Sequence, residues 1–350
     1  MLIHGGALEC EGRGGFRAKL AGVITALILA NLLAWGWAAS AFSAQPVLMG
    51  MALLAFSLGL RHALDADHIA AIDNVTRKLM QEGMRPVAVG LFFALGHSAV
   101  VVIASIAVAS TARSYADQLA PYREIGGLLG TSASALFLLA IAAANLSVLV
   151  AVLGALRGGN DGRTLRDEEV DALLVRRGWL ARLLAPVFGL VSQSWHLFPV
   201  GFLFALGFET ASEVSLFGLA AGASSEVSGW TILIFPLLFT AGMTLLDSVD
   251  GILMLGAYGW AYRKPTRKLF YNLTVTSISV LVAFLIGGIE VLGLIAQRLD
   301  LDGGLWAWIV ELNASFGMLG CAIVVLFVVS WGVSVAIHRC RRHDRIDEGA

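Results

Sequence analysis

The chain has 350 residues, of which 58% are hydrophobic and only 14% are charged, and its formal net charge is −1. Soluble domains carry roughly 25% charged residues, and a soluble protein this apolar would expose far too much hydrophobic surface. The near-neutral balance offers no positively charged surface for nucleic acid. The composition therefore predicts an integral membrane protein and excludes a soluble or nucleic-acid-binding one.

Eight apolar stretches are long enough to cross a hydrocarbon core, which takes about 20 helical residues. They cover residues 20–42, 47–72, 87–110, 125–156, 196–222, 230–261, 269–297 and 305–337. The fourth, sixth and eighth stretches exceed the length required, which favours a tilt or a break in those helices. We therefore predict an all-α integral membrane protein, with one transmembrane domain (1–350) built as a bundle of eight helices.

Lys and Arg fall almost entirely on one side of these spans. Twenty of the 24 lie in the two terminal tails and in the connections after the second, fourth and sixth spans. Arg113, Arg123 and Arg298 lie on the other side, and Arg61 remains inside a span. Because cytoplasmic loops are enriched in Lys and Arg, both termini are predicted to be cytoplasmic, in a bacterial inner membrane. The one sizeable cytoplasmic segment, 157–182, is expected to form an interfacial helix.

The second span contains RHALDADHI, residues 61–69. Ionisable groups are costly inside a bilayer and normally mark a cavity, a partner or a pathway. At 100° per residue, Arg61, His62, Asp65 and His68 share one side of a straight helix, and Asp67 points to the opposite side. A straight helix would thus offer two imidazoles and one carboxylate to an ion, whereas a broken helix would let all of these groups converge.

Imidazole nitrogens combined with carboxylate oxygens suit Ni, Co, Zn or Cu better than Mg or Ca, which prefer all-oxygen shells. Asp65 or Asp67 has an alternative role, in which it orients a histidine that binds the ion. The competing interpretation is an interhelical His–Asp hydrogen-bond network without a metal. Two histidines and two aspartates within seven residues of one span favour the metal site. In a straight, untilted helix the cluster would lie in the inner half of the membrane, so a mid-membrane site requires a tilt or a break.

Further ionisable residues occur in the third, fifth and sixth spans. The histidine of the third span follows a glycine, which thins the helix and permits close approach of another helix. The two glutamates and the two aspartates are spaced i,i+4 and i,i+3, so each pair lies on one helix face. Each pair can neutralise either a divalent cation or Arg61. These candidate residues are His97, Glu209, Glu213, Asp247 and Asp250.

Three other polar residues of the spans receive no role in the metal site. Asn145 is expected to form an interhelical hydrogen bond, and His196 is expected to lie at the membrane interface. Glu290, in the seventh span, is predicted to be buried, and the sequence alone suggests no function for it.

Beyond these individual residues, whole segments of the sequence resemble the nickel/cobalt transporter (NiCoT) family of membrane permeases. The resemblance spans the second to the sixth predicted helices in the family's order. The matching segments are RHALDADHI (61–69), AIDNVTRK (71–78), FFALGHSAVV (92–101), PVGFLFALGFETASEV (199–214), GMTLLDSVDG (242–251) and AYGWAYRKP (257–265).

The resemblance implies eight spans, cytoplasmic termini and high-affinity uptake of Ni²⁺ or Co²⁺, with the ion as transported substrate and no other cofactor. It implies that His62, Asp67 and His68 are essential. It also places five further residues in secondary signatures of the family: His97, Glu209, Glu213, Asp247 and Asp250.

The chain departs from the family pattern at three positions. Leu64 replaces Val or Phe, Ser248 replaces Thr, and Glu209 stands where Asp is usual. None of these changes removes a ligand type, but the longer Glu209 side chain leaves the preference between nickel and cobalt open.

No nucleotide-binding motif occurs in the sequence, so uptake is expected to use the membrane potential or an ion gradient, with no ATPase subunit and no partner beyond the ion and the lipid bilayer. Two other classes use the same ligands. A membrane metalloenzyme would need more histidines for a multi-histidine di-iron site, and the sequence lacks HExxH. A metal sensor would bind the ion without moving it across the membrane.

Overall fold

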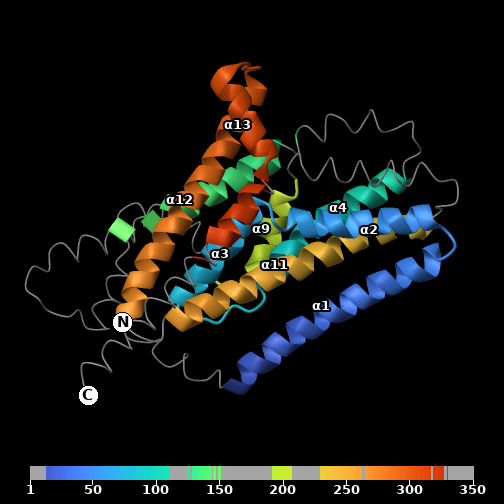
Figure 1. Cartoon of the computed structure of the whole chain (residues 1–350), viewed down its shortest axis with the longest axis horizontal. Helices are drawn as coiled ribbons and strands as arrows, with labels where there is room; N and C mark the ends of the chain where they lie inside the picture. The colour runs from blue at the N-terminus through green and yellow to red at the C-terminus, as the bar shows by residue number, and fades with distance from the viewer. Residues whose placement is uncertain are drawn as a thin grey trace, which may run out of the picture.

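The computed structural model describes residues 13–110, 128–143, 191–206, 229–261, 265–316 and 318–326, and six single positions (125, 145, 146, 149, 150 and 329). Every element named within these ranges is helical, which confirms the predicted all-α class (Figure 1). The elements are α1 (Arg13–Phe42), α2 (Pro46–His62), α3 (Ala66–Gln81), α4 (Val89–Ser110), η2 (Ser194–His196), α9 (Leu197–Phe204), η3 (Gly229–Leu233), α11 (Ile234–Ala261), α12 (Pro265–Arg298) and α13 (Gly304–Ala314).

Four helices in the described ranges are long and apolar enough to cross a membrane, and six spans result if each of two bent helix pairs counts as one. The four are parts of α1, α4, α11 and α12, and they match the predicted first, third, sixth and seventh spans. The fourth and fifth predicted spans lie partly outside the described residues. Within the described part they are represented by the shorter apolar helices Leu128–Ala143 and Ser194–Phe204. The total of eight spans stays a prediction.

The second predicted span, 47–72, is broken. Its two halves, α2 and α3, meet at an angle of 53° around a short turn of residues 63–65. The turn satisfies its own backbone, because the Leu64 amide donates to Arg61 O at 3.0 Å and the Asp65 amide to His62 O at 2.9 Å. Asp65 itself is extended (φ −65°, ψ 144°) and directly precedes α3. The eighth predicted span is bent as well, since α13 and helix Met318–Leu326 meet at 71°.

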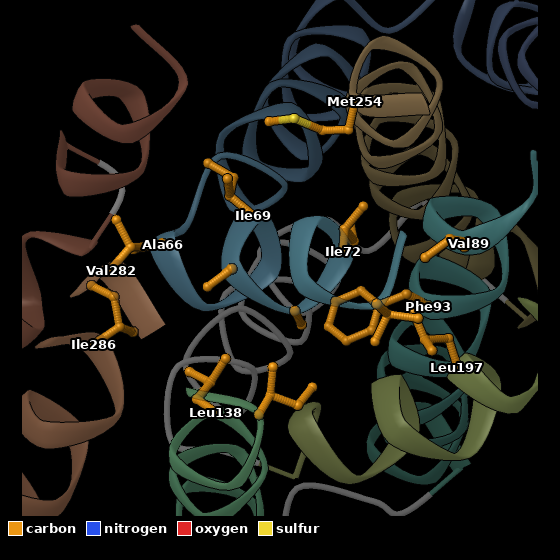
Figure 2. Packing of buried hydrophobic residues seen from close by; sticks show 14 of the residues in the cluster. Ala66, Ile69, Ile72, Val89, Phe93, Leu138, Leu197, Met254, Val282 and Ile286 are labelled. Carbon is orange, nitrogen blue, oxygen red and sulfur yellow. The ribbon is translucent and has the colours of Figure 1, made fainter. Parts of the chain in front are cut away.

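Helix α3 is the centre of the larger apolar cluster, although it is the most polar of the long helices. Ile69 and Ile72 project from α3 among side chains of α4, α9, α11 and α12, as Figure 2 shows. The helix continues to Gln81, nine residues beyond the predicted end of the span. Arg77, predicted to lie in a cytoplasmic loop, is fully buried, whereas Arg61, predicted to be buried, is exposed at the protein surface.

Helix α11 is the main packing partner, in contact with α1, α2, α3 and α4. Its contact with α2 is a backbone-to-backbone one, because a Cβ at Gly59 would lie 2.1 Å from Phe239 O and one at Gly242 would lie 2.5 Å from Phe56 O. By contrast, α1 lies along the edge of the bundle against α11 and α2 (Figure 1). The polar break in the second span is therefore enclosed by α4 and α11, and α1 stays outside.

Candidate metal site

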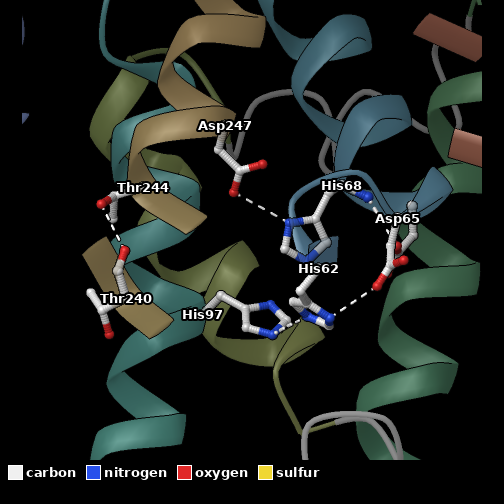
Figure 3. A network of polar contacts seen from close by, with 8 residues as sticks. His62, Asp65, His68, His97, Thr240, Thr244 and Asp247 are labelled. Atoms are coloured by element: carbon white, nitrogen blue, oxygen red, sulfur yellow. Dashed lines mark hydrogen bonds and ion pairs between the residues drawn. The ribbon is translucent and has the colours of Figure 1, made fainter. Parts of the chain in front are cut away.

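Three histidines from three helices meet at the break between α2 and α3. His62 is the last residue of α2, His68 lies in the first turn of α3, and His97 lies in α4. One ring nitrogen of each lies within 4.8 Å of those of the other two, and all three side chains are buried. Figure 3 shows the three rings turned toward one another. The sequence prediction that these histidines belong together is supported by this geometry.

His62 has different partners at its two ring nitrogens. Its Nδ1 lies 2.9 Å from Asp65 Oδ2, and its Nε2 lies 2.9 Å from Nε2 of His97. The atoms are close but make no hydrogen bond in this geometry, and a carboxylate at this distance favours the tautomer with the proton on Nδ1 and the lone pair on Nε2. The contact fits the second of the two roles that the sequence left open for Asp65, that of orienting a histidine.

His68 repeats this arrangement with a partner from another helix. Its Nδ1 lies 3.3 Å from Oδ2 of Asp247 on α11, and both side chains are fully buried. Its Nε2 is buried and has no hydrogen-bond partner among the described residues. A buried polar atom without a partner costs about 1–3 kcal/mol, so this nitrogen is a candidate for a ligand that the protein itself does not supply.

The close approach predicted beside Gly96 holds His97 against the cluster. A Cβ at Gly96 would lie 1.9 Å from Phe198 O of α9, so only glycine allows α9 to pack this closely on α4. The neighbouring His97 ring lies 4.7 Å, centroid to centroid, from the rings of both His62 and His68.

Asp67 does not join the three imidazoles. Its Oδ1 accepts a hydrogen bond from the backbone amide of His68 at 3.0 Å, and its charge acts on both His68 and Glu290 of α12. Glu290 is buried, as predicted, and Ser134 Oγ lies 2.8 and 3.0 Å from its two carboxylate oxygens. The predicted separation of Asp67 from its neighbours is thus retained in the broken helix.

Asp247 and Asp250 serve different partners on α11. Asp247 contacts His68, and Asp250 has one buried oxygen without a hydrogen-bond partner among the described residues. Asp250 lies near Asp247 and Asp73 of α3, whose charges act on it. Arg61, which was expected to be buried and to need a counter-charge from one of the acidic pairs, is exposed.

Sequence reasoning missed a second polar cluster on α3. Asp73 accepts hydrogen bonds from the Tyr258 hydroxyl of α11 and, at 2.6 Å, from Ser279 Oγ of α12. At the next residue, Asn74 Oδ1 accepts from Arg77 Nη2 at 2.9 Å and from Asn145 Nδ2 at 2.8 Å. The signal was the i,i+4 spacing of Asp73 and Arg77, which extends the polar pattern of the helix past the predicted end of the span.

Of the remaining candidates, Asn145 forms the interhelical hydrogen bond predicted for it. His196 lies outside the histidine cluster, partly exposed in η2, where its Nδ1 accepts from the Ser192 amide at 3.1 Å. Glu209 and Glu213, and the segment 157–182, lie outside the described residues.

An apolar helical bundle with several membrane-spanning helices defines a multi-pass membrane protein. Residues 48–337 match the sequence model of the NicO family, described as high-affinity nickel-transport protein. The match covers most of the chain, which therefore belongs to this family.

Individual relatives extend the match over nearly the whole length. A high-affinity nickel transport protein of Cupriavidus necator is 51% identical over 344 residues, 98% of this chain and 97% of that protein. The nickel transporter NixA of Staphylococcus aureus is 43% identical, covering 91% and 94% of the two chains. The cobalt transport protein NhlF of Rhodococcus rhodochrous is 39% identical, covering 90% and 91%. No solved structure matches the chain. The family and these relatives are transport proteins rather than enzymes, as the sequence predicts for this chain.

Proposed function

We propose that the protein takes up a divalent transition-metal ion, nickel or cobalt, across the bacterial inner membrane, and that His62, His68 and His97 bind the ion on its way. The observation that carries the proposal is the convergence of three buried imidazoles, two of which have a carboxylate at Nδ1. The names of the relatives support nickel or cobalt as the substrate.

A hydrogen-bond network without a metal accounts poorly for this arrangement. The carboxylates of Asp65 and Asp247 favour a proton on Nδ1 of both His62 and His68, and each Nε2 then presents a lone pair to the centre of the cluster. His97 can donate a proton to one of these lone pairs but not to both. A bound cation satisfies both lone pairs together.

The distance between two of the nitrogens also suits a transition-metal ion. Two nitrogens bound at about 2.05 Å to one ion and at 90° to each other lie about 2.9 Å apart, the geometry of octahedral and tetragonal complexes. His62 Nε2 and His97 Nε2 are 2.9 Å apart. The two Nδ1–carboxylate contacts are the outer-shell partners that ligating histidines usually have.

The carboxylates beyond the cluster suggest a route for the ion. Asp67 adjoins the cluster toward α12, and Asp247 and Asp250 follow one another along α11. We propose that these aspartates, with Glu209 and Glu213 of the fifth predicted span, lower the cost of a divalent cation in the apolar bundle. The ion would enter from the periplasm and lose its water in steps.

The contacts near the ends of the helices are consistent with the predicted cytoplasmic side. The Arg85 guanidinium carbon lies 5.6 Å above the ring of Phe16 at the start of α1, and Lys78 Nζ donates to Val191 O. These contacts join the N-terminal end of α1, the connection after α3 and the segment before α9, which are regions predicted to be cytoplasmic. Both termini are accordingly proposed to lie in the cytoplasm.

Uptake of a divalent cation needs no ATPase subunit. Moving two charges inward gains about 4.6 kcal/mol per 100 mV, which supports about a thousandfold gradient. The membrane potential alone therefore suffices to drive accumulation, and a coupled ion gradient is an addition rather than a requirement.

The test is radiolabelled Ni²⁺ and Co²⁺ uptake into proteoliposomes with an imposed potential, negative inside. We expect His68→Ala to abolish uptake, since it removes one imidazole of the cluster. His196→Ala is the matched variant, because it removes a histidine that lies outside the cluster. Equal uptake by wild type and His68→Ala would refute the proposed site, and binding without flux in the wild type would favour a sensor over a transporter.

A further inference from the structure

Helix Met318–Leu326 touches the second span at the point where that span breaks. Gly320 is buried there, and a Cβ on it would lie 1.5 Å from Leu64 O, 2.7 Å from Leu64 C and 3.1 Å from Asp65 C. All three are backbone atoms, which cannot rotate away as a side chain can. Among the glycines described, none leaves less room for a Cβ. Figure 1 shows the red C-terminal helix beside the start of α3.

This helix is firmly seated against α3. Phe316, just before the helix, and Ile323, within it, are buried in the same apolar cluster as Ala66 and Ile69. The helix cannot move away from the Leu64–Asp65 peptide without exposing these side chains. A side chain at position 320 would therefore have to displace the peptide of the break rather than the helix.

The Leu64–Asp65 peptide is connected to two of the three histidines. On one side, Asp65 Oδ2 contacts His62 Nδ1 at 2.9 Å. On the other, Asp65 O accepts the first hydrogen bond of α3, from the Ile69 amide at 3.2 Å, and His68 lies within that turn. A shift of this peptide consequently changes the orientation of the His62 ring and the start of the helix that carries His68.

We propose that Gly320 is a positioning residue for the histidine cluster, and that its missing side chain lets the C-terminal helix set the geometry of the break between α2 and α3. The inference rests on the proposed function, since it takes the three histidines to bind the transported ion. It assigns the eighth predicted span a part in the selectivity of a site to which it contributes no ligand.

The test uses the full-length protein purified in detergent and titrated with Co²⁺, whose d–d absorption reports the geometry of its ligands, and with Ni²⁺ in competition. Loss of an outer-shell partner of a metal ligand typically costs 10- to 100-fold in affinity. For Gly320→Ala we expect Co²⁺ affinity to fall by about 10-fold or more, with a changed absorption spectrum and a changed Ni²⁺/Co²⁺ affinity ratio. Gly256→Ala is the matched variant, because a Cβ at Gly256 of α11 would meet nothing within 4 Å.

The spectrum and the affinity ratio separate positioning from stability, since a variant that is merely less stable binds with wild-type properties in its folded fraction. If Gly320→Ala yields no folded protein, Phe316→Leu loosens the same helix without adding an atom at the contact, and it should shift both readouts in the same direction by a smaller amount. A wild-type Co²⁺ spectrum and a wild-type Ni²⁺/Co²⁺ affinity ratio, in Gly320→Ala or in Phe316→Leu if that variant is used instead, would overturn the inference. His68→Ala is measured alongside: if it binds Co²⁺ like the wild type, the proposed metal site itself has failed.

Discussion

Helices α1 and α3 are opposites in composition and in burial. The apolar window of α1 is only 6% buried inside the protein, and Leu32 and Leu33 are 64% and 72% exposed. Twelve of the sixteen residues of α3 are buried, among them Asp73, Asn74 and Arg77. In a bilayer the surrounding solvent is itself apolar, so hydrophobicity indicates contact with lipid, while polarity indicates a place inside the protein.

The strongest test of this comparison is the removal of a histidine at the α2–α3 break. His62→Ala deletes one of the three converging imidazoles and leaves Asp65 without its partner. We expect Ni²⁺ affinity to fall by more than about 100-fold, beyond the 10- to 100-fold typical of outer-shell partners. Calorimetric titration of the purified protein measures this. Leu33→Ala in α1, as the counterpart, should bind like the wild type; equal losses in the two variants would contradict the comparison.

Acidification should weaken ion binding at the same histidine cluster and therefore lower uptake. Protons compete with the ion for imidazole nitrogens, so affinity falls as the pH drops below the ordinary imidazole pKa of about 6.5. Uptake into proteoliposomes is measured from pH 7.5 to 5 with equal pH on both sides and a constant potential. A flat profile would argue against imidazole ligands.

Removing the carboxylate behind a histidine should have a smaller effect than removing the histidine. Asp247→Asn keeps the size of the side chain but removes the charge that faces His68 Nδ1 at 3.3 Å. We expect Ni²⁺ affinity to fall by about 10-fold. Asp65→Asn should lower Ni²⁺ affinity by a similar amount through His62. Because the two carboxylates face different histidines, the two losses should add in the double variant. If Asp247→Asn loses as much affinity as His62→Ala, Asp247 binds the ion directly.

Removing a hydrogen bond to Asp73 should lower the stability of the protein rather than its affinity for the metal. Tyr258→Phe removes one of the two hydroxyls that Asp73 accepts from, and Tyr258 is fully buried. A hydrogen bond to a charged group contributes about 1.5–3 kcal/mol, so the thermal midpoint in detergent should fall measurably. Ni²⁺ affinity of the folded protein should stay unchanged. A lower affinity at unchanged stability would instead connect Asp73 to the ion route.

The smallest effect is expected on α1. Leu33→Ala shortens a side chain that faces away from the protein, and exposed substitutions usually change stability by less than about 0.5 kcal/mol. Thermal unfolding in detergent and uptake should both match the wild type. A loss comparable to that of Tyr258→Phe would mean that α1 is covered by protein, not by lipid.

Much of this arrangement could be predicted from residue spacing. Hydropathy located the long spans, because a helix that faces lipid must be apolar along its whole length. The position of Asp67 on the far side of a straight helix conflicts with the importance that the family resemblance gives it, and this conflict predicts a distorted second span. The bend of 53° between α2 and α3 confirms it.

What the sequence could not predict were the contacts between distant helices. Arg61 and Arg77 were assigned opposite environments from those observed, because counting apolar residues ended the span at 72. The polar helix α3 continues past that point, protected by α11 and α12. The pairing of His68 with Asp247, 179 positions away, depends on helix packing that no local pattern encodes.

The pairing of two of the three imidazoles with a carboxylate has a consequence for protein design. His62 with Asp65 and His68 with Asp247 are the units that define the site, and they come from three different helices. Copying the three histidines alone onto another helical bundle would transfer rings whose tautomers and orientations are undetermined. A transplanted site would need at least these five side chains and the interrupted helix that brings them together.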